Sequence, residues 1–76
     1  MAKFTVEKGK RYRAHIELNF FESMVGNDTI IQKLEDAGFV DVKAAGSGSE
    51  RQAVGTWPHE TVNGDMPEQI VKVEEV

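Results

Sequence analysis

The sequence lacks cysteine, so neither a disulfide nor a thiolate metal site can stabilise its fold. It also lacks any apolar run near the roughly 18 residues that a membrane-spanning helix needs. The first residues, Met1–Lys8, contain no apolar core of signal-peptide length. From these three absences we expect a soluble protein that has no membrane partner and is either cytoplasmic or exported by a route other than its own signal.

Positive charge and aromatic residues are scarce. The chain has nine lysine and arginine residues and thirteen acidic residues, which gives a net charge of −4. Aromatic residues make up 8% of the chain. Nucleic-acid binders need cations to replace phosphate counterions, and single-strand binders need exposed rings on which bases stack. The composition therefore argues against a nucleic-acid partner.

The few cations are unevenly placed. Five of the nine lie in the first thirteen positions, while four acidic residues and one lysine lie in the last twelve. One interpretation is that the two ends lie side by side and their charges pair across neighbouring strands. The other is a basic patch for an anionic partner.

The length of 76 residues is enough for a single domain spanning residues 1–76. Hydrophobic residues make up 39% of the chain, which is ordinary for a compact domain. A domain this small buries only about 60% of the surface of its unfolded chain. It therefore has little interior in which to form a catalytic pocket.

The clearest pattern is the strict alternation of apolar and polar residues from Arg11 to Phe20. Period two predicts a strand with one buried face, which carries Tyr12, Ala14, Ile16, Leu18 and Phe20. Because Phe20 and Phe21 are adjacent, either the strand ends at Phe21 or one of the two rings is exposed. A shorter strand at Phe4–Val6 precedes it, and a turn at Glu7–Lys10 gives Gly9 a positive φ.

One helix follows. Its apolar stripe consists of Ile30, Ile31, Leu34 and Ala37. Asn27 or Asp28 can cap its start, and Gly38 is expected to end it in a left-handed conformation, with Phe39 folding back on the last turn. We expect Leu34 and Ile16 to be core residues. Residues 21–26 form a short helical turn or a loop.

The rest of the chain predicts strands at Val40–Ala44, Arg51–Trp57 and Ile70–Val76. The first two form a hairpin with a long, mobile tip at residues 46–49. Residues 58–67 are predicted to be a loop with a turn at Asn63-Gly64. The fold class is therefore α+β, with the order β-(β)-α-β-β-β. One helix packs on one face of a mainly antiparallel sheet of four or five strands. The strands before and after the helix would be parallel if adjacent.

Part of this pattern resembles a known family. The strand Tyr12–Ile16, the phenylalanine at Phe20 or Phe21, the helix ending in Ala37-Gly38-Phe39 and the segment Arg51–Trp57 resemble the first half of a SPOR domain. SPOR domains are ferredoxin-like modules of bacterial division proteins that bind peptidoglycan. The resemblance covers about residues 12–57. It implies a glycan site on the sheet and a second helix after Trp57, where this sequence has no helical stripe.

No motif for chemistry is present. His15 and His59 are far apart and have no cysteine beside them, so they do not form a metal motif. There is no nucleophile elbow, and Gly46-Ser47-Gly48-Ser49 has no following lysine to make a phosphate loop. We therefore expect a protein that is not an enzyme and has no cofactor.

The remaining hypothesis is a binding module. A helix on one face leaves the polar face of the sheet uncovered, with Arg11, Arg13 and Arg51 as charged anchors for a partner. Trp57, before Pro58 at a strand end, is either a second anchor or a lid over the core edge. A protein partner fits best, and accessory proteins of phages or mobile elements that act on a host protein belong to this class. The alternatives are a nucleic acid on the sheet face, a SPOR-like glycan and a homodimer.

Overall fold

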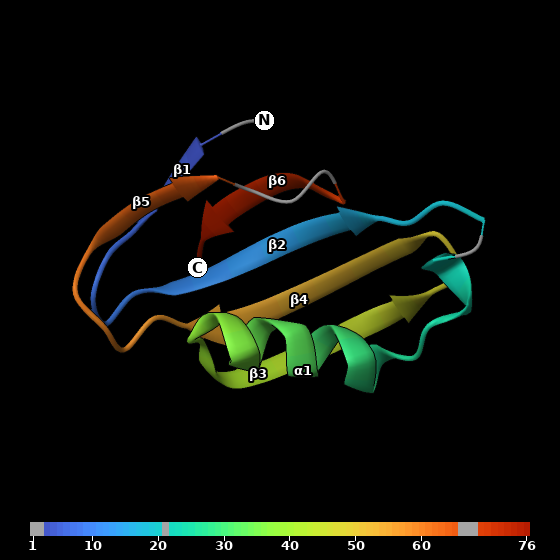
Figure 1. The fold of residues 1–76 in the computed structure, drawn as a ribbon, viewed down its shortest axis with the longest axis horizontal. Helices are drawn as coiled ribbons and strands as arrows, with labels where there is room; N and C mark the ends of the chain where they lie inside the picture. The colour runs from blue at the N-terminus through green and yellow to red at the C-terminus, as the bar shows by residue number, and fades with distance from the viewer. Residues whose placement is uncertain (1–2, 21, 66–68) are drawn as a thin grey trace.

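The structure is a computed structural model that describes residues 3–20, 22–65 and 69–76. It contains one α-helix packed against antiparallel sheets, which confirms the α+β class (Figure 1). There are more strands than the sequence predicts. The elements are β1 (Lys3–Val6), β2 (Arg11–Glu17), the 3-10 helix η1 (Glu22–Met24), α1 (Asn27–Ala37), β3 (Val40–Ser47), β4 (Glu50–Thr56), β5 (Val62–Asp65) and β6 (Ile70–Glu75).

The main sheet has the strand order β3-β4-β2-β6, and every neighbouring pair is antiparallel. Strands β2 and β3, which flank the helix in sequence, run parallel but are not adjacent, because β4 lies between them. A separate two-stranded sheet pairs β1 with β5. We call this pair the β1–β5 ribbon.

Strand β2 forms as the alternation predicts. Tyr12, Ala14 and Ile16 are buried, whereas the residues between them point to the opposite face. The strand ends at Glu17, and Leu18 is half-buried against the core. Phe20, expected to point inward, lies beyond the strand and is 80% exposed. The prediction for Phe21 lies outside the described residues.

Helix α1 ends as predicted but starts differently. Gly38 has a φ of 118°, its N–H donates to the Glu35 carbonyl, and the Phe39 N–H donates to the Leu34 carbonyl. These two bonds complete a left-handed cap. At the start, Gly26 is the cap residue, and no side chain caps the helix. The predicted cap by Asn27 or Asp28 is therefore wrong. Leu34 is only half-buried.

The hairpin of β3 and β4 is tighter than expected. Ser47 pairs with Glu50, so only Gly48 and Ser49 form the turn, and the prediction of a long tip is wrong. Gly46 has a φ of 100°, and a Cβ there would lie 2.6 Å from the Glu50 carbonyl oxygen. Only glycine fits that position. Gly46 therefore allows β3 to continue into residues that the sequence analysis predicted to be a flexible tip.

The segment predicted as a loop contains β5. Val62 pairs with Val6, and Asn63-Gly64 lies within the strand rather than in a turn. The short strand β1 thus pairs with β5 and not with β2. A four-residue strand is too short to show a clear period, and its partner lies far away in sequence. The turn before β2 is as predicted, because Gly9 has a φ of 80° and the Lys10 N–H donates to the Glu7 carbonyl.

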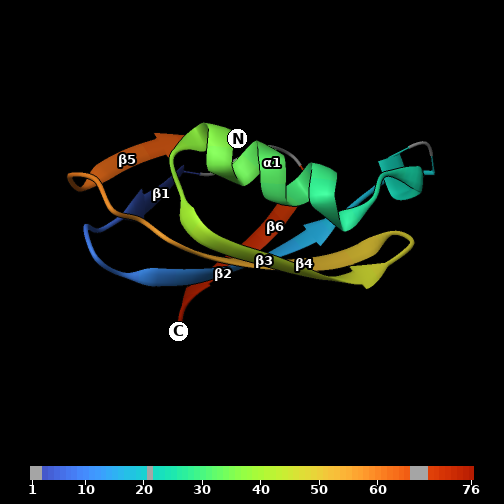
Figure 2. The same cartoon turned by 90° about the horizontal axis from the view of Figure 1, so that it is seen from below.

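The layers are clear in Figure 2. Helix α1 and the β1–β5 ribbon lie on the same side of the four-stranded sheet, and no element covers the other side among the described residues. The core lies on the covered side and contains Tyr12, Ala14, Ile16, Ile30, Ala53 and Trp57, each 2–9% exposed. Among the described residues, the helices are all shorter and more polar than a membrane-spanning helix has to be.

Candidate functional site

An apolar cavity of about 680 Å³ lies on the covered side of the sheet, and we call it the groove. It forms because α1 packs over β3 and β4, while the β1–β5 ribbon lies toward β2 and β6 (Figure 1). The two covering elements therefore leave apolar residues of the sheet between them. Cavities of about 300–1,000 Å³ are typical of small-molecule sites.

The floor of the groove is the inward face of three strands. Its residues are Tyr12, Ala14, Ile16, Ala53, Ile70 and Val73. Pairing of Ala14 with Ala53 on one side and with Val73 on the other puts these small side chains in one row. Because cross-strand partners point to the same face, the floor is continuous and apolar.

The walls come from the two covering elements. One flank of α1 contributes Thr29, Lys33 and Ala37, which lie on one side of the helix at four-residue spacing. The β1–β5 ribbon contributes Phe4, Val6, Val62 and Gly64. Val62 is 45% exposed, so the ribbon wall presents apolar surface to solvent.

Trp57 lies where the end of α1 meets the end of β4 and lines the groove. Its ring is 9% exposed and packs edge-on against Phe39, at 5.0 Å between centroids, and against His59, at 5.1 Å. The indole N–H donates to the Glu60 carbonyl over 2.9 Å. Of the two roles considered for Trp57, this geometry matches the lid over the core edge.

Glu22, in η1, is an acidic residue in the lining. One carboxylate oxygen accepts the Asn19 N–H over 3.0 Å, and the other accepts the Gln69 amide N–H over 2.6 Å. The backbone hydrogen bond from Asn19, followed by that from Gln69, lowers the pKa of Glu22. The carboxylate is therefore held ionised and already has donors for both oxygens.

Arg51 is not on the polar face, so its assignment as an anchor there is corrected. It is 6% exposed and shares the inward face of β4 with Ala53, Gly55 and Trp57. Its guanidinium group donates to Gly48 O at 3.1 Å, Asn27 Oδ1 at 2.9 Å and Ser23 O at 3.0 Å. It thereby ties the hairpin tip to η1 and to the start of α1.

Arg11 and Arg13 do lie on the uncovered face. The Arg11 Nη1 atom donates to Thr56 Oγ1 over 2.9 Å and to the Asp41 carbonyl over 3.1 Å. Arg13 is half-buried and lies opposite Glu74 in the register. The side chain of Arg11 is thus engaged within the protein.

The same face carries a pair formed by His15 and Glu74, whose Nε2 and Oε1 atoms are 2.8 Å apart. The hydrogen bond from His15 is the largest cause that lowers the pKa of Glu74, and Lys72 and Arg13 add to it by charge. Across the chain ends, Lys10 lies 3.7 Å from Glu75. Cations near the start and acids near the end therefore do pair.

The four residues predicted as a site are not brought together. Arg11 and Arg13 lie on one face of the sheet, while Arg51 and Trp57 lie on the other. Arg51 and Trp57 are also separated from each other by about 20 Å, which is nearly the length of β4. The sequence reasoning missed the groove because Phe4 and Val62 belong to short strands. Arg51 is separated from Ala53 and Trp57 by an even number of residues, and in a strand such residues point to the same face. This spacing is a sequence signal that places Arg51 on the inward face.

Comparisons with known proteins identify no relative of this chain. No protein-family model, no curated protein and no solved structure matches this chain. The resemblance to SPOR domains thus stays an expectation from the sequence. The described residues contain no cluster of three or more side chains that could hold a metal ion.

Proposed function

We propose that the protein is a non-catalytic binding module that receives an apolar segment of a partner protein in the groove. The observation that carries this proposal is the apolar cavity of about 680 Å³ between α1 and the β1–β5 ribbon. The cavity is lined mainly by apolar side chains of the sheet, the helix and the ribbon. A concave and mostly apolar cavity of this size is the usual form of a binding site.

The charges of the described residues favour a protein partner over a nucleic acid. The uncovered face places Arg11, Arg13 and Lys43 beside Asp41 and Glu74, so the two signs are mixed. In the groove, the aromatic rings pack against one another, as Phe4 does against Tyr12 at 5.3 Å. Neither surface offers the cationic track with free stacking platforms that single strands need.

The proposal is tested with a display library of random peptides selected on the immobilised protein. Two matched variants decide where the selected peptides bind. Val62→Glu puts a charge on the ribbon wall, whereas Val71→Glu puts the same charge on β6 outside the groove lining. The two valines are similarly exposed, at 45% and 52%.

We expect apolar peptides that bind the parent and Val71→Glu but lose at least tenfold in affinity for Val62→Glu, because a carboxylate cannot lie against apolar side chains without losing its water. Circular dichroism of both variants checks that each is folded. If the selected peptides bind both variants equally well, or if no peptide is recovered, the groove is not a protein-binding site.

A further inference from the structure

We infer that Lys33 selects the charge of the partner: the segment that enters the groove carries a carboxylate side chain beside its apolar residues. This inference rests on the proposed function and adds the chemistry of the occupant. It concerns the one position at which the described lining of the groove presents a cation.

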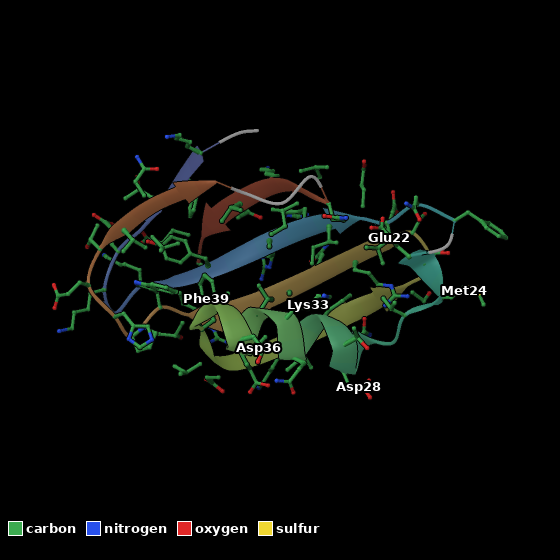
Figure 3. The ribbon with its side chains drawn as sticks, viewed as in Figure 1. Glu22, Met24, Asp28, Lys33, Asp36 and Phe39 are labelled. Carbon is green, nitrogen blue, oxygen red and sulfur yellow. The ribbon has the colours of Figure 1, made fainter. Side chains whose placement is uncertain are left out.

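Lys33 belongs to the wall of the groove rather than to the outer face of the helix. It lies one turn from Thr29 and one turn from Ala37, both of which also line the cavity. In Figure 3, Lys33 is on α1 between the end marked by Phe39 and the start marked by Asp28. Lys33 thus lies along the middle of the wall.

Within the described part of the chain, no carboxylate lies within salt-bridge distance of Lys33. The nearby acid Asp36, one turn along, accepts a hydrogen bond from Gln32 over 2.9 Å. The exposed ammonium group of Lys33 therefore has all its donors available for a partner.

Among the described residues, the acid in the lining, Glu22, forms no ion pair with Lys33. Both carboxylate oxygens of Glu22 already accept hydrogen bonds, from Asn19 and Gln69. The negative charge of Glu22 remains, but its two oxygens are already occupied, so Lys33 is the charged group of the described lining whose donors a ligand can reach. A segment with apolar side chains and one acid is complementary to such a site.

A purely structural role for Lys33 is the alternative that the experiment must separate. The aliphatic part of a lysine can cover apolar surface while its ammonium group stays in water. Lys33→Met keeps that apolar stem and removes the charge, and Lys33→Glu reverses the charge. Lys43→Glu is the matched control, because Lys43 is exposed on the uncovered face of the sheet.

The test uses three display libraries of apolar heptapeptides that differ at one fixed position, which is Glu, Gln or Lys. On the parent protein we expect the Glu library to be enriched over the Lys library. The selected Glu peptides should bind the parent protein roughly two- to fivefold more tightly than the same peptides with Gln at the fixed position, as expected for one exposed ion pair. Lys33→Met should abolish this preference, Lys33→Glu should reverse it, and Lys43→Glu should leave it unchanged.

The outcomes separate this inference from the proposed function. If peptides bind in the groove with equal affinity whatever the fixed residue, the inference about Lys33 is wrong while the proposed function holds. If no library yields a peptide, the proposed function itself fails. Dodecanoate is added as a separate probe. If it binds in the groove and no peptide does, the occupant is a small amphipathic anion, and a peptide partner is ruled out.

Discussion

The guanidinium group of Arg51 and the side chain of Asn27, 24 residues apart in sequence, are joined by a hydrogen bond of 2.9 Å from Nη1 to Oδ1. The amide N–H of the same Asn27 side chain donates to the Gly46 carbonyl over 3.2 Å. Asn27 therefore bridges the start of α1 to the β3–β4 hairpin. This link holds in place the end of the helix from which the groove wall begins.

The first prediction concerns this link. Arg51→Met should lower the free energy of unfolding by about 2–3 kcal/mol, because the carbonyl groups of Gly48 and Ser23 and the Asn27 side chain lose a charged donor that is itself buried. Urea denaturation followed by circular dichroism measures the change. Lys43→Met, on the exposed face, should stay within about 0.5 kcal/mol of the parent. Equal stability of Arg51→Met and the parent would show that these bonds do not support the fold.

The second prediction compares two glycines with positive φ. Gly38→Ala should cost more stability than Gly9→Ala, although both force an alanine into the left-handed region. A Cβ on Gly38 would lie 3.0 Å from the Trp57 ring, whereas a Cβ on Gly9 would meet nothing within 4 Å. Gly9→Ala should cost about 1 kcal/mol, and Gly38→Ala should cost more than that because Trp57 must shift. Thermal melting and the emission spectrum of the single tryptophan report both effects.

The third prediction ranks two core positions. Ile30→Ala should destabilise the protein by about 2–3 kcal/mol, since Ile30 is the buried residue of α1. Leu34→Ala should cost less, because Leu34 is half-buried and borders the groove. Denaturant midpoints of the two variants check the order. The reverse order would mean that α1 presents a different face to the sheet.

The fourth prediction concerns acid. The pKa of Glu74 lies below its ordinary value of 4.5, so Glu74 contributes stability that is complete above that value. This contribution is lost as the pH falls from that value through the lowered pKa, since the unfolded chain binds a proton at Glu74 before the folded state does. Carboxyl-carbon NMR titration should show the low pKa of Glu74, and His15→Ala should raise it. If His15→Ala leaves the titration unchanged, the hydrogen bond between these side chains does not form in solution.

The elements with strong local patterns are those that the sequence predicts. Strand β2 has its alternation, and α1 has its stripe and the left-handed stop at Gly38, so the α+β class follows. Strand β5 and its pairing with β1 depend on hydrogen bonds between residues about 60 positions apart, for which four residues give no local signal. The two-residue turn of the hairpin was hidden because glycine and serine are common both in flexible linkers and in tight turns.

The candidate binding surface was predictable only in part. The alternation in β2 places Arg11 and Arg13 on the uncovered face, as predicted. The groove exists because the β1–β5 ribbon packs over part of the sheet and leaves the rest open. The position of the ribbon depends on the pairing of β5 with β1, which the sequence does not predict. The proposed role of Lys33 follows only after the groove is located, because on a helical wheel Lys33 lies on the polar, solvent-facing side of the helix.

The central claim is that the groove binds an apolar segment of another protein, and methyl NMR tests it most directly. A peptide from the display selection is titrated into the methyl-labelled protein. We predict shift changes at the floor residues Ala14, Ile16 and Val73, with Ala45 and Val71 outside the groove unaffected. Changes confined to Ala45, Val71 and the Arg11–Arg13 face, with the floor methyls unmoved, would contradict the claim.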